Sequence, residues 1–137
     1  HGLVPQMYTD LCDIDWGDWS GLSTDEVHAH FPGQWEAWCT EENYTEHGGE
    51  SFAQAYQRAG ALLSRLRQFS HQPRTPQEEQ DIAVVCVTHK TTMLSMLAHV
   101  HQHPPQEWVV AHMAQNEPAR GSVLDLSFDG ETGAITV

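Results

Sequence analysis

The feature that most constrains the fold is an unbroken apolar run from Ile82 to Thr88, which leads directly into His89. Its length suits a β-strand, and it lacks the alternation of a strand that has one face in water. Such a run is typical of a strand covered on both faces, as in a parallel sheet flanked by helices. We therefore expect an α/β protein, with a three-layer α/β/α arrangement around a mostly parallel sheet.

Local patterns predict the helices of the first half of the chain. Ser23, with Glu26 three residues further on, forms a capping box that opens a short helix. Trp35 and Trp38 share one face of a second short helix. The clearest helix opens at Ser51 and carries an apolar stripe with helical spacing: Phe52, Ala55, Tyr56, Ala59, Leu62, Leu63 and Leu66.

The second half supplies one more helix and a hairpin. Residues 91–100 have the pattern of a helix, and two strands, residues 122–128 and 134–137, are joined by a Gly-containing turn. A buried strand at 82–88 needs neighbours on both edges, and the visible sequence offers few. We therefore expect residues 1–137 to be a single, partial domain whose central strand lies upstream of His1.

Composition excludes several classes of protein. The chain has 137 residues, 39% of them apolar, and five are Trp, which is the profile of one folded domain. Six Lys and Arg against nineteen Asp and Glu give a net charge of −13, so nucleic acid is not expected as a partner. No apolar run is long enough to span a membrane.

The cysteines indicate the compartment. Cys12, Cys39 and Cys86 have no paired spacing, so we expect buried core thiols in a reducing environment, and hence the cytoplasm. A signal peptide upstream of His1 would leave no trace in this sequence.

His89 is the first candidate for chemistry. Ligands of open α/β sheets bind beyond the carboxyl ends of strands, where the next helix begins. Lys90, Thr91 and Thr92 follow His89, and their amides open that helix and can face an anion. A surface histidine in a turn is the alternative.

Metal binding has weaker support. Asp13, Asp15 and Asp18 invite a calcium interpretation, but the glycine and glutamate that an EF-hand loop needs are absent. His99 and His101, with His103, alternate along a predicted helix end, a spacing that brings ligands together on a strand and not on a helix. We expect no metal and no cofactor.

Four segments in order resemble the histidine phosphatase superfamily, in its phosphoglycerate mutase-like branch. Residues 11–22 are similar to the family's Leu-Arg-Glu-Ile-Asp-Phe-Gly-x-Trp-Glu-Gly segment. Gly48-Gly49-Glu50-Ser51, followed by Arg58, matches its Gly-Gly-Glu-Ser helix start. Residues 85–90 resemble the strand that ends in Val-Ser-His-Gly, with Thr-His-Lys as a variant, and residues 121–123 resemble the start of the late strand.

The resemblance implies a phosphomonoester hydrolase that works through a phosphohistidine and without a metal. It assigns His89 as the second phosphate-binding histidine, Asp13 as the acid that protonates the leaving oxygen, and the amides of Lys90 and Thr91 as phosphate ligands. The implied partner is a small phosphorylated metabolite or inorganic phosphate, with a homodimer as a further option.

The chain departs from the family pattern in ways that matter. The Arg-His-Gly segment with the nucleophile and the Ser-Ser-x-Leu-x-Arg-Ala segment are both absent. Asp13 stands where Glu is usual, and Lys90 replaces Gly. The resemblance thus predicts an N-terminally truncated phosphoglycerate mutase-like fold that is inactive by itself. The alternative is a degenerate, non-catalytic binding module.

Overall fold

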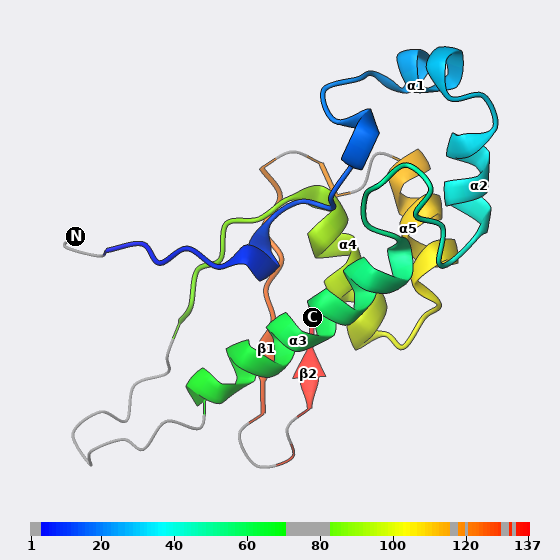
Figure 1. The fold of residues 1–137 in the computed structure, drawn as a ribbon. Helices are drawn as coiled ribbons and strands as arrows, with labels where there is room; N and C mark the ends of the chain where they lie inside the picture. Colours follow the sequence, from blue (N-terminus) through cyan, green and yellow to red (C-terminus); the bar gives the residue numbers. More distant parts are fainter. Residues whose placement is uncertain (1–3, 71–82, 116–117, 120, 130–131, 133) are drawn as a thin grey trace, which may run out of the picture.

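The computed structural model describes residues 4–70, 83–115, 118–119, 121–129, 132 and 134–137. Within them the chain is mostly helical (Figure 1). In chain order the elements are the 3-10 turns η1 (Thr9–Leu11) and η2 (Gly17–Trp19), the helices α1 (Thr24–His30), α2 (Gln34–Thr40), α3 (Phe52–Ser70), α4 (Lys90–Val100) and α5 (Pro105–Ala114), and the strands β1 (Ser127–Phe128) and β2 (Ile135–Thr136).

The predicted helices are confirmed. The Ser23 hydroxyl accepts from the Glu26 amide at 3.3 Å, and the Glu26 carboxylate accepts from the Ser23 amide at 2.8 Å, so α1 begins with a complete capping box. The two short helices α1 and α2 lie together at one end of the molecule (Figure 1). The apolar stripe of α3 faces inward: Phe52, Ala55, Ala59, Leu62 and Leu63 are buried.

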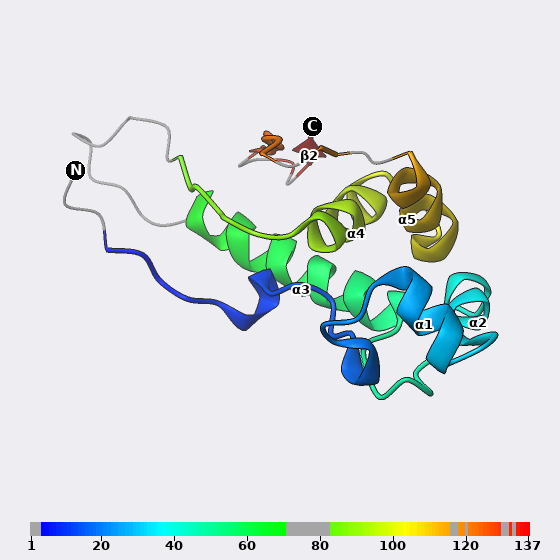
Figure 2. The ribbon, with the colours of Figure 1, turned by 90° about the horizontal axis from the view of Figure 1, so that it is seen from above.

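The long helix α3 is the base of the fold. It packs mainly against α4, which in turn packs against α5 (Figure 2). The β1–β2 hairpin and the residue before it pack on α3 and α4. Their apolar side chains are those of Leu126, Phe128 and Ile135. They contact a buried cluster formed by Ala59, Leu62 and Leu63 of α3 and Met96 of α4. The two strands pair antiparallel, with Phe128 opposite Ile135, which confirms the predicted hairpin in shortened form.

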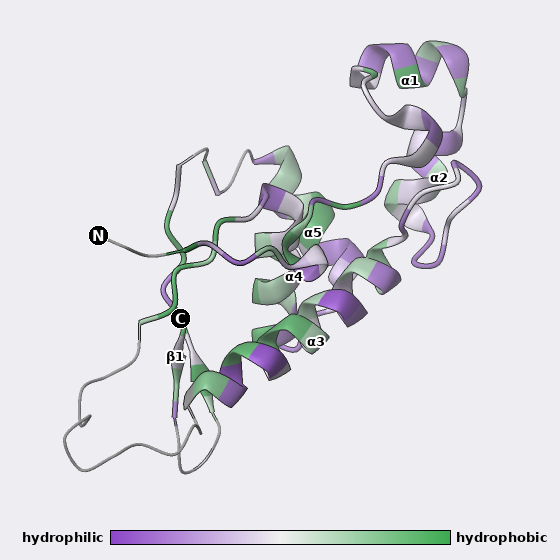
Figure 3. Ribbon diagram, turned by 60° about the vertical axis from the view of Figure 1, so that its left-hand side comes forward, coloured by the Kyte–Doolittle hydropathy of each residue, from purple (hydrophilic) through white to green (hydrophobic). Residues whose placement is uncertain are grey.

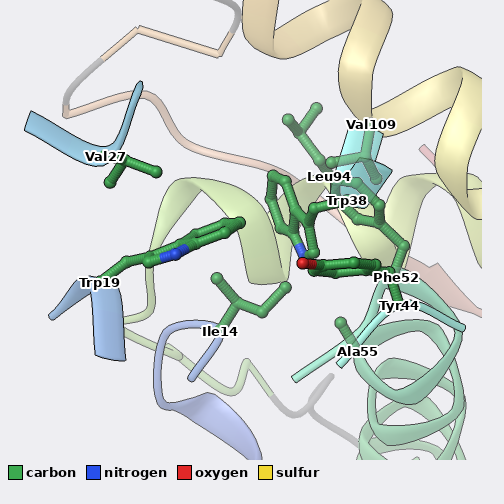
Figure 4. Packing of buried hydrophobic residues seen from close by; sticks show 9 residues of the cluster. All are labelled: Ile14, Trp19, Val27, Trp38, Tyr44, Phe52, Ala55, Leu94 and Val109. Atoms are coloured by element: carbon green, nitrogen blue, oxygen red, sulfur yellow. The ribbon is translucent and has the colours of Figure 1, made fainter. Parts of the chain in front are cut away.

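A second cluster joins the helices α1 to α5 to the segment around η2 (Figure 4). Trp38 lies at its centre, 1% exposed, with its ring 4.1 Å from that of Phe52. Trp19 and Trp35 add tilted and edge-on contacts at 5.3–6.0 Å. Burying large rings contributes more per residue than any other apolar contact, so this cluster fixes the positions of α1 and α2.

The predicted burial on both faces is wrong for residues 83–88, and Ile82, the first residue of the predicted strand, lies outside the described residues. Residues 83–89 run extended into α4 and keep their hydrophobic character (Figures 1 and 3), but Val85 is 88% exposed and Val87 86%. Burial on both faces requires a sheet covered by helices on each side, and among the described residues the only backbone ladder joins β1 to β2. Cys86 and Thr88, which point to the other side, are half-buried.

The parallel sheet is not present in the described part of the chain, which holds a two-stranded antiparallel sheet. Cys12 is exposed and Cys39 and Cys86 are half-buried, so the expectation of core thiols fails for Cys12. No helix in the described ranges has the length and apolarity to cross a membrane.

His47 is a buried histidine inside the aromatic cluster. Its ring is 1% exposed and stacks on Trp19 at 4.3 Å and on Tyr44 at 5.8 Å. Burial lowers the pKa of His47 below its ordinary value of 6.5, and the charges of Asp15 and Asp18 act in the opposite direction. The neutral ring is therefore the form that fits the fold.

This arrangement predicts a stability that depends on pH. The unfolded chain takes up a proton on His47 near its ordinary pKa, while the folded chain takes it up only at lower pH, so the free energy of unfolding falls as pH drops below about 6.5. His47→Gln should flatten this dependence by up to about 1.4 kcal/mol per pH unit between pH 7 and 5. Urea unfolding at both pH values measures it, with the exposed His30→Gln as control. Equal slopes in His47→Gln and the wild type would contradict the assignment.

Candidate functional site

His89 occupies the N-cap of α4, at the point where the extended segment ends. Its backbone is extended, and its carbonyl accepts the first helical hydrogen bond, from the Met93 amide at 3.0 Å. The amides of Lys90, Thr91 and Thr92 therefore precede the helical ladder of α4. The His89 side chain is 58% exposed, so the predicted surface position beside a helix N-terminus is present.

Asp13 lies beside His89, although the two are 76 positions apart in the sequence. The Oδ2 atom of Asp13 is 3.9 Å from Nδ1 of His89, and the Asp13 side chain is 38% exposed. The other carboxylate oxygen of Asp13 accepts from the Ile14 amide at 2.9 Å. The structure thus brings together the two residues that the resemblance paired, at an open position that a ligand can reach.

Two threonines join the backbone around His89 to the backbone that precedes Asp13. The Thr88 hydroxyl donates to the Leu11 carbonyl at 2.7 Å, and the Thr92 hydroxyl donates to the Cys12 carbonyl at 2.7 Å. Because Thr88 and Thr92 flank His89, they attach its loop to the segment that carries Asp13. The sequence did not predict either role, because a hydrogen bond between residues so far apart in the chain leaves no recognisable pattern of residue spacing.

Arg58 holds the same segment from the other side. Its guanidinium forms a two-pronged ion pair with Glu50, at 2.8 Å from Nε and 2.7 Å from Nη2. Its remaining N–H groups reach three main-chain oxygens, those of Asp10 and Cys12 at 2.9 Å and that of Asp13 at 3.4 Å. The hydrogen bonds to Glu50 raise the pKa of Arg58. Arg58 is therefore committed to protein acceptors, and not to a phosphate.

The backbone of residues 15–18 lies directly on that of residues 47–50. The Asp15 carbonyl accepts from the Glu50 amide at 2.7 Å, and the His47 carbonyl accepts from the Asp18 amide at 2.8 Å. A Cβ on Gly49 would lie 2.2 Å from the Asp15 carbonyl oxygen, so only glycine allows this approach. The Gly-Gly-Glu motif thereby fixes Glu50 where Arg58 needs it.

The other candidates are placed as follows. The Thr91 side chain is 4% exposed, which leaves its amide as the group for a ligand. His99 packs on Tyr56 at 4.7 Å, away from His101 and His103, whose rings lie 6.1 Å apart. No group of three or more His, Cys, Asp or Glu side chains in the described ranges is arranged to hold a metal.

Comparisons with known proteins bear on this site. Residues 1–136 match the model of the histidine phosphatase superfamily (branch 1), which confirms the resemblance drawn from the four segments. The chain is 31% identical over 108 residues to the glucosyl-3-phosphoglycerate phosphatase of Mycobacterium tuberculosis, over 78% of this chain and 48% of that protein. It is 33% identical over 87 residues to phosphoserine phosphatase 1 of Hydrogenobacter thermophilus, over 63% of this chain and 37% of that protein.

Solved structures give the same result. A mycobacterial glucosyl-3-phosphoglycerate phosphatase in complex with inorganic phosphate superimposes with a TM-score of 0.60 at 29% identity, over 80% of this chain and 52% of that one. The same phosphatase with VO3 superimposes with a TM-score of 0.65 at 27% identity, over 98% and 62%. The chain spans about half the length of the curated relatives it matches.

The three cysteines should differ in reactivity. Cys12 is exposed, whereas burial raises the pKa of both Cys39 and Cys86 above the ordinary value. Since the thiolate is the reactive form, Cys12 should be alkylated first near pH 8, and the other two should follow only as pH rises. Iodoacetamide labelling with peptide mass spectrometry measures the order. Modification of Cys86 as fast as Cys12 would contradict the described exposure.

Proposed function

Because the chain belongs to the histidine phosphatase superfamily (branch 1), we propose that residues 1–137 carry half of the active site of a phosphomonoester hydrolase. The observation that supports this most is the pair of His89 at the N-cap of α4 and Asp13 at 3.9 Å from it. A helix N-terminus together with an exposed imidazole suits a phosphoryl group, whose transfer depends mainly on charge stabilisation and positioning.

The proposed reaction has two steps. A histidine nucleophile forms a bond to phosphorus while the bond from phosphorus to the ester oxygen breaks, and Asp13 gives its proton to that oxygen. Water then attacks the phosphohistidine, Asp13 takes up a proton from this water, and inorganic phosphate leaves. In both steps His89 and the amides of Lys90 and Thr91 hold the phosphoryl oxygens.

The nucleophile in this proposal comes from a segment outside the 137 residues. Two observations support it. The chain spans about half of its curated relatives, and Val84, Val85 and Val87 lie exposed in an extended segment that has no strand partner among the described residues. The extended segment before His89 is apolar and, within the part of the chain that the structure describes, has free edges, as expected of a strand that pairs with a neighbouring strand. Residues 1–137 would then be a single, partial domain, completed into a parallel sheet.

The substrate class follows from the relatives. Their printed names are those of phosphatases for glucosyl-3-phosphoglycerate and phosphoserine, both small phosphorylated metabolites. We propose that this protein also acts on a small phosphorylated metabolite, without naming a particular ester. The free cysteines are the basis for proposing the cytoplasm. A homodimer remains a prediction, which sedimentation velocity tests.

The alternative is a non-catalytic binding module. It is favoured by the side chain of Asp13, which is one methylene shorter than the Glu that is usual at this place in the family. A binding module would retain phosphate without turning over an ester.

A fusion enzyme separates these possibilities. The N-terminal part of the M. tuberculosis relative, which precedes its matched region, would be joined to residues 1–137 and assayed with p-nitrophenyl phosphate. We expect turnover that His89→Ala lowers at least about 100-fold in kcat/KM, the cost of removing a transition-state donor. The exposed His30→Ala is the control.

Three outcomes would contradict parts of the proposal. Phosphate binding by the fusion without turnover supports the binding module. Turnover that survives His89→Ala removes the role of His89. Turnover by residues 1–137 alone that disappears in His89→Ala removes the need for another segment.

A further inference from the structure

We propose that Arg58, held by Glu50, is a positioning residue that sets the main chain of residues 10–13 and so aims Asp13 at His89. The inference about catalysis rests on the proposed function, because it assigns Asp13 a role as acid. The inference about the main chain rests on the contacts alone.

The carbonyls of residues 10–13 depend on side chains for the hydrogen bonds that the structure describes. Arg58 donates to three of these four consecutive carbonyls, and the fourth, that of Leu11, accepts from Thr88. The η1 turn includes only the first part of the segment. Nothing in a helix or sheet ladder therefore sets the direction of the Asp13 Cα–Cβ bond.

Arg58 is suited to this task by its place and its chemistry. It lies on α3, the longest helix, and its side chain is 19% exposed, while that of Glu50 is 15% exposed. A guanidinium presents five N–H groups in a rigid plane, and here they reach both carboxylate oxygens and three carbonyls. A lysine ammonium has three donors around one atom and cannot span this set.

Glu50 extends the constraint beyond Asp13. Its amide donates to the Asp15 carbonyl at 2.7 Å, and its carboxylate accepts from the Asp15 amide at 3.4 Å. The Glu50–Arg58 pair thus contacts the segment on both sides of Asp13. A shift of the main chain on the scale of 1 Å at this point would move the carboxylate by a distance that can cost about 100-fold in rate.

Cys12 provides a probe at the right place. Its thiol is exposed, while its carbonyl accepts from both Arg58 and Thr92. A nitroxide spin label on Cys12, in a Cys39→Ser/Cys86→Ser background of the 137-residue chain, reports the motion of this segment. Arg58→Lys keeps the charge and removes the fork, so we expect a label spectrum with a markedly more mobile component.

A matched control is available on the same helix. Arg65 lies two turns further along α3, is 45% exposed, and pairs with the Asp10 side chain at 3.0 Å through a single contact. A lysine can replace this contact, so Arg65→Lys should leave the label spectrum unchanged.

A second readout follows Asp13 itself. In the wild type, Asp13→Asn should shift the Hε1 resonance of His89, because the two side chains are adjacent. In the Arg58→Lys background we expect this shift to fall to half or less. Circular dichroism confirms that each variant is folded at the temperature used. If Arg58→Lys does not fold, Thr92→Val, which removes the other donor to the Cys12 carbonyl, takes its place with the same expected direction.

The outcomes are distinct. An ordered label and a full His89 shift in folded Arg58→Lys would overturn the positioning role. Equal label mobility in Arg65→Lys and Arg58→Lys would overturn it as well. The measurements need no turnover, so an inactive fusion enzyme counts against the proposed function and not against the role of Arg58. In an active fusion, Arg58→Lys should lower kcat by up to about 100-fold with little change in KM.

Discussion

Four consecutive carbonyls, those of residues 10–13, need hydrogen-bond donors that no regular element supplies, and the arrangement of the fold around the site follows from this need. Buried or half-buried carbonyls are rarely left without donors, because an unpaired one costs about 1–3 kcal/mol. Arg58 comes from α3, and Thr88 and Thr92 come from the two sides of His89. The same contacts therefore satisfy the main chain and join α3, the loop of His89 and the segment of Asp13 into one unit.

The helical part of the chain is well packed, whereas the extended part is not. Trp38, Phe52 and Leu94 belong to one buried cluster that connects the helices α1 to α5 to the segment around η2. The valines at 85 and 87 have the same apolar character and lie almost fully exposed. The difference is one of geometry: a helix satisfies its own backbone and needs only a neighbour on one face, while a central strand needs partners on both edges.

This contrast explains what could be predicted from the sequence. Helices α1, α2, α3 and α4 were predictable because capping and apolar spacing are local signals. The burial of residues 83–88 was not, because it depends on neighbours that are not encoded in the run itself. Helix α5 was not predicted, since Pro104-Pro105 was interpreted only as the end of α4, although Pro105 begins the next helix at a position that proline favours. In the site, the motifs predicted the meeting of His89 and Asp13, but Arg58 lay off the apolar stripe of α3 and gave no sign of its contacts.

The distribution of charge limits how the site could bind a phosphoryl group. Residues 1–57 contain eleven acids and neither Lys nor Arg, so the segment of Asp13 lies in a negative environment. The first base, Arg58, is neutralised by Glu50, and Arg65 pairs with Asp10. Arg58 and Arg65 are therefore used to hold the protein together. Under the proposed function, helix amides and the imidazole would stabilise a phosphoryl group at His89. A dianionic ester favours additional positive charge, and under the proposed function the segment that would carry the nucleophile would have to supply it.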